Sequence, residues 1–167
     1  MATTRERPIL LLGLGNDILT DDAVGLNIVR EIRHRLGDWP EYEACECEEM
    51  GLSLLDYIVG YRDLVLVDAV QTRHAAPGYL HEVGLDDLKI LPVMTPHFLG
   101  IGEILALGRK LELPVPVRVR IFAVEVENPF TLGTAMTPVI QAALPGIVDR
   151  LIGVLRELAE TGAQLGQ

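Results

Sequence analysis

Residues 8–25 read PILLLGLGNDILTDDAVG, and this stretch decides the fold. Its uninterrupted apolar run over residues 9–12 is typical of a strand buried on both faces, as in a parallel sheet covered by helices. After a turn of Gly and Asn, residues 21–36 place Val24, Ile28 and Ile32 at helical spacing. A buried strand followed directly by an amphipathic helix is the opening unit of an α/β fold.

The remainder of the chain repeats this alternation. Hydrophobic patterning predicts strands at 41–47, 64–67, 79–83 and 117–124, and helices at 52–60 and 98–110. A last helix of about 20 residues should begin at Pro138 and end near Glu160, with Pro145 and Gly146 kinking it or ending it early. This order predicts a doubly wound α/β sheet flanked by helices, with the strand at 79–83 near a sheet edge.

Composition excludes several classes of protein. The 167 residues carry 14 basic and 24 acidic side chains, a formal charge of −10, and 49% of them are hydrophobic. We therefore expect one domain over 1–167, with flexible ends at 1–7 and 161–167, and no nucleic-acid partner. No continuous apolar run reaches the roughly 20 residues of a membrane span, and residues 1–8 lack the hydrophobic region of a signal peptide, so we expect no membrane association. Only two cysteines, Cys45 and Cys47, indicate a reduced, cytoplasmic protein.

The turn after the first strand differs from a dinucleotide-binding loop. Gly13 and Gly15 match the first two glycines of such a loop, but Ile18 stands at the third position. Acidic side chains at the start of the following helix would repel a pyrophosphate from the site where helix N-terminal N–H groups usually bind it. Nucleotide binding is therefore less favoured than either of the two functions considered below.

Three residues at the expected strand ends form the candidate site. Asp21 and Asp22 begin the first helix, and spacing alone leaves open which of them caps the helix and which points into the cleft. Asp68 follows the buried strand at 64–67, and His97 precedes a helix. Doubly wound sheets bind ligands at the carboxyl ends of their strands. Two carboxylates and an imidazole, from Asp22, Asp68 and His97, suit a divalent metal such as zinc or nickel.

Other chemistries lack the residues that they need. Ser53 is the only serine and has no nucleophile-elbow glycines around it. Cys45 and Cys47 lie on one face of one expected strand and supply at most half of a metal site. The remaining histidines, His34 and the pair His74 and His81, are expected at the surface.

The acidic surplus is expected to be local. Asp17, Asp21, Asp22 and Asp68 should cluster at one cleft, with Glu46, Glu48 and Glu49 beside it. Such a cleft would attract a cation and repel phosphate.

Five short motifs in register resemble one family. They are Gly13-Leu-Gly15-Asn16 with Asp21-Asp22-Ala-Val-Gly25, Leu64-Val-Leu-Val-Asp68-Ala69, Ala76-Pro77-Gly78, Thr95-Pro96-His97-Phe-Leu-Gly100 and Met136-Thr137-Pro138. Together they resemble the [NiFe]-hydrogenase maturation endopeptidases, the proteases that process the C-terminus of the hydrogenase large subunit. The similarity runs in order from about residue 8 to about residue 160.

The resemblance implies a fold and a function. The fold would be a three-layer α/β/α of the phosphorylase/hydrolase-like type, with a mixed, mostly parallel sheet of about five strands. One strand would be antiparallel, and the edge strand after Pro77-Gly78 is our candidate for it. The function would be removal of the C-terminal extension from a large-subunit precursor after nickel insertion. The family's metal positions fall on Asp22, Asp68 and His97.

The resemblance leaves the mechanism open. Nickel carried by the substrate would dock against these residues, and zinc or cadmium could occupy the same site in vitro. The metal could polarise the scissile carbonyl or activate a water, or Asp22 or Asp68 could act as general base. With three ligands the free enzyme, expected to be a monomer, should bind metal weakly. The alternative is a nickel-sensing chaperone that docks the large subunit without cutting it.

One segment departs from the family's pattern. Many relatives carry a small, Gly-containing turn preceded by Asp after the second strand, whereas this chain has Cys45-Glu-Cys-Glu-Glu-Met50-Gly51. Glu46 stands in place of the Asp. If this segment faces the substrate, we expect a different hydrogenase class as substrate, or altered activity.

Overall fold

Five strands form one sheet in the computed structural model, which describes residues 8–87, 97 and 100–165. The order across the sheet is β2 (Tyr42–Cys47), β1 (Ile9–Leu14), β3 (Asp63–Val70), β5 (Arg118–Glu125) and β4 (Leu80–Val83). The first four are parallel, and β4 pairs antiparallel with β5 at the edge. The mixed, mostly parallel sheet and the antiparallel edge strand after Gly78 are both confirmed.

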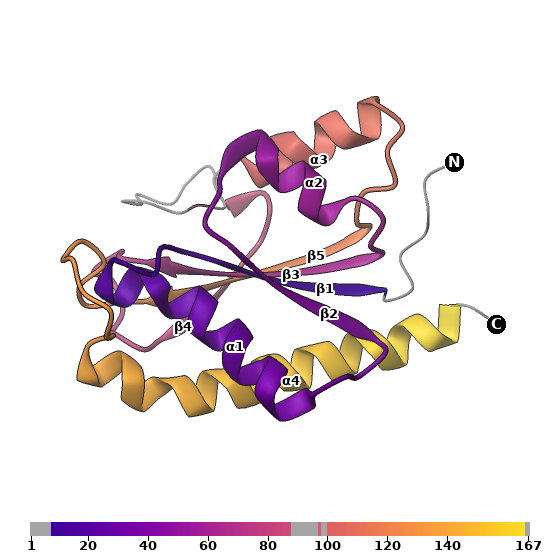
Figure 1. Ribbon diagram of the computed structural model, residues 1–167. Helices are drawn as coiled ribbons and strands as arrows, with labels where there is room; N and C mark the ends of the chain where they lie inside the picture. Colours follow the sequence, from indigo (N-terminus) through magenta and orange to yellow (C-terminus); the bar gives the residue numbers. More distant parts are fainter. Residues whose placement is uncertain (1–7, 88–96, 98–99, 166–167) are drawn as a thin grey trace.

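Helices cover both faces of this sheet (Figure 1). The helix α1 (Val24–Leu36), preceded by the 3₁₀ turn η1 (Thr20–Ala23), lies with α4 (Pro138–Leu165) on one face. The short helix α2 (Leu54–Ile58), preceded by η2 (Gly51–Ser53), lies with α3 (Ile101–Lys110) on the other face. The three-layer α/β/α architecture is therefore confirmed.

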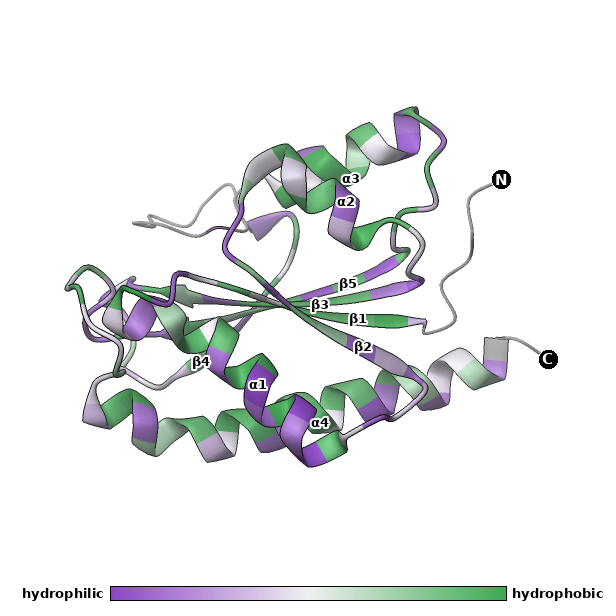
Figure 2. Cartoon of the chain, viewed as in Figure 1, coloured by the Kyte–Doolittle hydropathy of each residue, from purple (hydrophilic) through white to green (hydrophobic). Residues whose placement is uncertain are grey.

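The central strands are apolar on both faces because both faces are covered. Alternate residues of β1 point to opposite sides: Ile9 and Leu11 join the core under α1 and α4, while Leu10 and Leu12 join the core under α2 and α3. All six residues of β1 and all eight of β3 are buried. Figure 2 shows the resulting hydrophobic band through β1 and β3. This two-sided burial explains the continuous apolar runs in the sequence.

Two elements differ from the sequence prediction in length. The strand β3 runs to Val70, so Asp68 lies inside the strand, opposite Ala123 of β5, rather than after its end. Pairing with β5 extends β3 because β5 is long enough to hydrogen-bond these extra residues. The predicted helix at 52–60 is shorter and begins with η2. Of the helix predicted at 98–110, residues 98 and 99 lie outside the described part.

The C-terminal helix is longer than predicted. It runs for 28 residues to Leu165 and continues through Pro145 without ending, so residues 161–165 are helical. Buried residues spaced along it, such as Ile140, Val148 and Leu155, pack into the core against α1 and hold the helix together. By length and composition α4 is the one described helix that could span a membrane, but 39% of that span is buried in the protein. Residues 1–7 and 166–167 lie outside the described part.

Candidate active site

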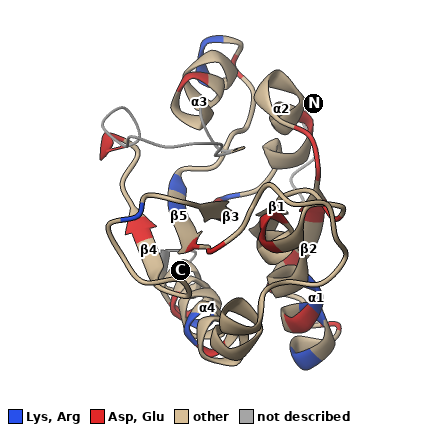
Figure 3. Ribbon diagram, turned by 90° about the vertical axis from the view of Figure 1, so that its left-hand side faces the viewer, with Lys and Arg blue, Asp and Glu red and all other residues tan. Residues whose placement is uncertain are grey.

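The candidate site lies where the strand order reverses. The chain moves from β1 to β2 on one side of the sheet, while β3 lies on the other side of β1. Loops that leave neighbouring strands in opposite directions open a crevice at their carboxyl ends. The η1 turn after β1 and the last residues of β3 border this crevice, and His97 precedes α3. Figure 3 looks onto this edge of the sheet.

Two glycines allow α1 to cross close to β1. A Cβ atom on Gly25 would lie 2.3 Å from the Leu14 carbonyl oxygen, and one on Gly13 would lie 2.3 Å from the Gly25 oxygen. Any side chain at either position would push the helix away from the strand. The close approach places η1, and with it Asp22, over the crevice. Close packing of α1 on β1 therefore explains Gly13 and Gly25, and no bound phosphate is needed to explain either glycine.

Asp21 and Asp22 have different roles, and neither caps a helix. The Asp21 carboxylate is fully buried and accepts hydrogen bonds from the backbone N–H groups of Asn128 at 2.8 Å and Thr137 at 2.7 Å. Its other donors include the Thr137 hydroxyl and the Glu127 N–H. Asp21 therefore anchors the loop between β5 and α4, and the expectation of a capping residue was wrong. Asp22 is the member of the pair that faces the crevice.

Asp68 orients His97 through two hydrogen bonds. The His97 backbone N–H donates to Asp68 Oδ2 at 2.7 Å, and its Nδ1 lies 3.2 Å from Asp68 Oδ1. A third donor, the Ala69 N–H, lies 2.8 Å from Oδ1. Since a carboxylate accepts but does not donate, we assign the imidazole proton to Nδ1, which leaves the Nε2 lone pair free. The hydrogen bond to Asp68 raises the pKa of His97, while burial opposes it.

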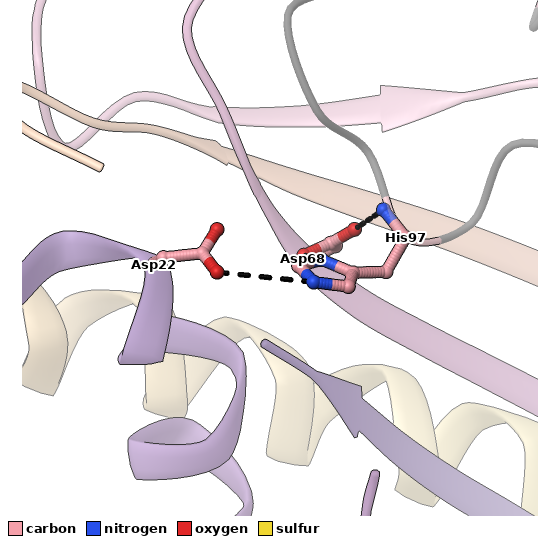
Figure 4. Close-up of side chains that lie close together, drawn as sticks. All are labelled: Asp22, Asp68 and His97. Atoms are coloured by element: carbon pink, nitrogen blue, oxygen red, sulfur yellow. Dashed lines mark hydrogen bonds and ion pairs between the residues drawn. The ribbon is translucent and has the colours of Figure 1, made fainter. Parts of the chain in front are cut away.

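Asp22 faces the free nitrogen of that imidazole (Figure 4). Its Oδ2 lies 3.8 Å from His97 Nε2, and the residue is only 3% exposed. Burial raises the pKa of Asp22 to about 6; the Asp68 charge adds to this and His97 opposes it. One ligand atom from each of Asp22, Asp68 and His97 lies within 4.8 Å of the other two. The structure thus brings together the three residues that the sequence selected.

The three side chains differ in what they can offer a metal. A carboxylate has about four acceptor positions, and three of those on Asp68 already receive hydrogen bonds. Burial raises the pKa of Asp68, and the bonds from His97 and Ala69 oppose it. Asp22 and His97 instead line a pocket of about 360 Å³ together with Met50 and Phe130. Coordination positions left open at this site therefore face the pocket.

The expected cluster of acids at the cleft is only partly present. Asp17 forms a salt bridge at 2.5 Å with Arg30, and Glu46 pairs with Arg30 and Arg33. Glu48 accepts a hydrogen bond from the Asp17 N–H. These acids tie the loop after β1 to β2 and α1, and Asp21 holds a different loop. Of the acids predicted for the cleft, Asp22 and Asp68 are the two that belong to the cluster of potential metal ligands among the described residues.

A further buried acid lies at the same edge of the sheet, and the sequence prediction missed it. Glu125, at the end of β5, is 1% exposed and accepts hydrogen bonds from Thr72, from the Arg73 N–H and from His81 Nε2 at 2.9 Å. Burial acts to raise the pKa of Glu125, but these bonds outweigh it and lower the pKa. His81, expected at the surface, is thus a partner of Glu125. No local pattern distinguishes this Glu from an exposed strand-end residue.

Comparisons with known proteins agree with the fold and the motifs. The family model described as hydrogenase maturation protease matches residues 26–154. The hydrogenase 2 maturation protease of Escherichia coli (strain K12) is 29% identical over 152 residues, which cover 89% of this chain and 91% of that protein. The structure of hydrogenase maturating endopeptidase HybD from E. coli superposes with a TM-score of 0.73 at 25% identity, over 89% of this chain and 92% of that one.

A more distant structure supports the fold alone. The [NiFe] hydrogenase maturation protease HybD from Thermococcus kodakarensis gives a TM-score of 0.69 at 20% identity, over 88% of this chain and 98% of that chain.

The fold and the family match define the class of protein. A mixed α/β/α sheet, with two aspartates and a histidine at its switch point, is here the scaffold of a protease. The chain belongs to the hydrogenase maturation protease family. The resemblance seen in the five sequence motifs is therefore confirmed.

Proposed function

We propose that this protein is an endopeptidase that removes the C-terminal extension of a [NiFe]-hydrogenase large-subunit precursor after nickel insertion, and that it works in the cytoplasm. Family membership supports the proteolytic activity and the substrate class. The observation that carries the proposal is the convergence of Asp22, Asp68 and His97 within 4.8 Å at the crevice. A cation-binding set beside a pocket suits a substrate that presents its own metal.

Nickel arrives with the substrate in this proposal. Asp22 and His97 both line the pocket, and Asp68 holds the imidazole with Nδ1 toward itself and Nε2 toward Asp22. Such outer partners fix the ring tautomer and make the other nitrogen a better ligand. Among the described residues, free metal would find only Asp22, His97 and the one acceptor position left on Asp68, which makes a weak site, so the ligands that nickel brings with the precursor would complete it. Zinc or cadmium would fill the same site in vitro.

Asp22 is the better candidate for a general base. Asp68 is fully buried and already accepts three hydrogen bonds, so it has no access to a water in the pocket. Asp22 lines the pocket, and its pKa of about 6 keeps it ionised but basic near neutral pH. The substrate's nickel would polarise the scissile carbonyl or the attacking water. We assign Asp68 a positioning role.

Processing of a nickel-loaded precursor tests this proposal. The protein is incubated with the precursor, and loss of the C-terminal extension is followed by mass spectrometry. Asp22→Asn should abolish the loss of the extension. Asp17→Asn, on the same loop but paired with Arg30 outside the site, should retain it. Stable binding of several precursor classes without any cleavage would instead support the non-cleaving chaperone.

A further inference from the structure

Large apolar side chains are exposed around the active-site crevice. Among the described residues, exposed large hydrophobic side chains follow the carboxyl ends of three parallel strands: Ile18 after β1, Met50 and Leu52 after β2, and Phe130 and Leu132 after β5. Met50 is 61% exposed and Phe130 is 48% exposed. Apolar groups gathered at one edge in this way mark a surface that another molecule covers.

Phe130 and Met50 form two walls of the pocket that contains Asp22 and His97. Leu19 and Pro129 complete its apolar lining, and the pocket measures about 360 Å³. Ligand pockets are typically of about 300 to 1,000 Å³, lined by apolar groups with a few polar ones. This volume lies near the lower limit, so it suits one or two side chains of an extended peptide rather than a helix.

The wall that carries Phe130 is held in place by backbone pairing. The Gly133 N–H donates to the Ile18 carbonyl at 2.9 Å, and the Thr20 N–H donates to the Thr131 carbonyl at 3.1 Å. Within the loop, the Asn128 side chain accepts from the Thr131 N–H at 3.2 Å. Together with the hydrogen bonds to Asp21, these bonds fix the loop before any substrate binds. A preformed wall reduces the ordering cost of binding.

Charge restricts what enters this pocket. An acidic side chain would meet the Asp22 carboxylate and be repelled. A basic side chain would pair with Asp22 and neutralise the carboxylate that the proposed reaction needs. An uncharged, apolar side chain can instead cover Met50 and Phe130, and it gains from the burial of their exposed surface.

We propose that this pocket receives an apolar side chain of the substrate's C-terminal tail beside the bond that is cut, and that Phe130 and Met50 select it. The inference rests on the proposed function, since that function brings the tail to Asp22 and His97. It also gives a role to the segment that departs from the family's pattern, because Met50 lies in that segment. The occupant is a stretch of polypeptide that follows the nickel-binding body of the precursor.

Truncating the two walls tests the proposal. Phe130→Ala and Met50→Ala should each lower kcat/KM for a nickel-loaded precursor by about tenfold or more, the size of effect expected when one wall of an apolar pocket is removed. Phe130→Leu should restore most of the rate. Val117→Ala and Leu111→Ala are the controls, because these residues are 75% and 56% exposed, precede β5 and follow α3 respectively, and do not line the pocket. Thermal unfolding checks that every variant folds.

Binding of the precursor is measured in parallel so that the two proposals fail separately. Unchanged cleavage and binding by Phe130→Ala and Met50→Ala would overturn the pocket's role while leaving the protease intact. If the wild type binds but never cleaves, the protease proposal fails, and weaker binding by the two variants would still support the pocket. If the wild type neither binds nor cleaves the precursor, both proposals are overturned.

Discussion

Replacing Asp22 with Asn should stabilise the metal-free protein at neutral pH while it abolishes processing. Asp22 is 3% exposed, and burial raises the pKa of its carboxyl from 3.8 to about 6. An acid whose pKa is higher in the folded state ionises more easily in the unfolded chain, so its charge lowers the stability of the fold. A difference of about 2 pKa units corresponds to about 3 kcal/mol, at roughly 1.4 kcal/mol per unit.

The sign of the pKa change gives this prediction a pH signature. Below 3.8 the carboxyl is neutral in both states, and Asp22→Asn should change stability little. Between 3.8 and about 6 the unfolded chain ionises first, so the wild type loses stability relative to the variant. Above about pH 6 the free energy of unfolding of Asp22→Asn exceeds that of the wild type by a constant amount of about 3 kcal/mol. In a chain of this size, that difference raises the Tm of the variant by about 6 to 12 °C.

Thermal unfolding from about pH 4 to about pH 8, with a chelator present, measures this difference. Asp17→Asn is the control: its salt bridge to Arg30 is exposed and lowers the pKa of Asp17, so this variant should be unchanged or slightly less stable near neutral pH. An Asp22→Asn protein that is no more stable than the wild type at pH 8, or a difference that does not grow with pH, would refute the reasoning.

Three further predictions concern the frame of the site. Asp21→Ala should lower the free energy of unfolding by about 3 kcal/mol, because buried N–H donors such as that of Thr137 lose their acceptor; urea unfolding measures this loss. Glu125→Gln should be less stable than the wild type at neutral pH, by about 2 kcal/mol. Because the pKa of Glu125 is lowered in the folded state, its carboxylate stabilises the fold above pH 4.5, and this stabilisation is lost as the pH falls through the folded-state pKa. The difference in stability between the wild type and Glu125→Gln should therefore disappear in acid. Gly25→Ala should prevent stable folding, since its Cβ would lie 2.3 Å from the Leu14 oxygen. Circular dichroism measures this, and a native spectrum of Gly25→Ala would contradict the prediction.

The sequence predicted the sheet because its strands are short and buried on both faces. Apolar runs at 9–12 and 64–67 could only be central strands, and the break before 79–83 identified an edge strand. The helix α4 differs from its prediction in two ways: it continues through Pro145, which breaks helices in general, and it extends past Glu160 to Leu165 although Thr161 and Gly162 are weak helix formers. Here the effect of Pro145 is local, since residues on both sides of it pack into the core and keep the helix continuous.

The candidate site residues were predicted from their positions at the ends of strands. This prediction succeeds where strand direction alone decides at which edge of the sheet a residue lies. Asp22 lies in the turn after β1 and Asp68 near the end of β3, and both lie at the carboxyl edge because β1 and β3 are parallel neighbours. The separate roles of Asp21 and Asp17 could not be predicted, because their partners are distant in sequence: Asp21 binds Thr137, and Asp17 binds Arg30. Glu125 gave no signal for the same reason.

Dependence of cleavage on nickel in the precursor tests the central claim most directly. Purified wild-type protein is incubated with one precursor in nickel-loaded and nickel-free forms, and release of the C-terminal extension is followed by mass spectrometry. If Asp22 and His97 bind the nickel that the precursor carries, the protein should cleave the nickel-loaded form alone. Equal cleavage of the nickel-free precursor would contradict it.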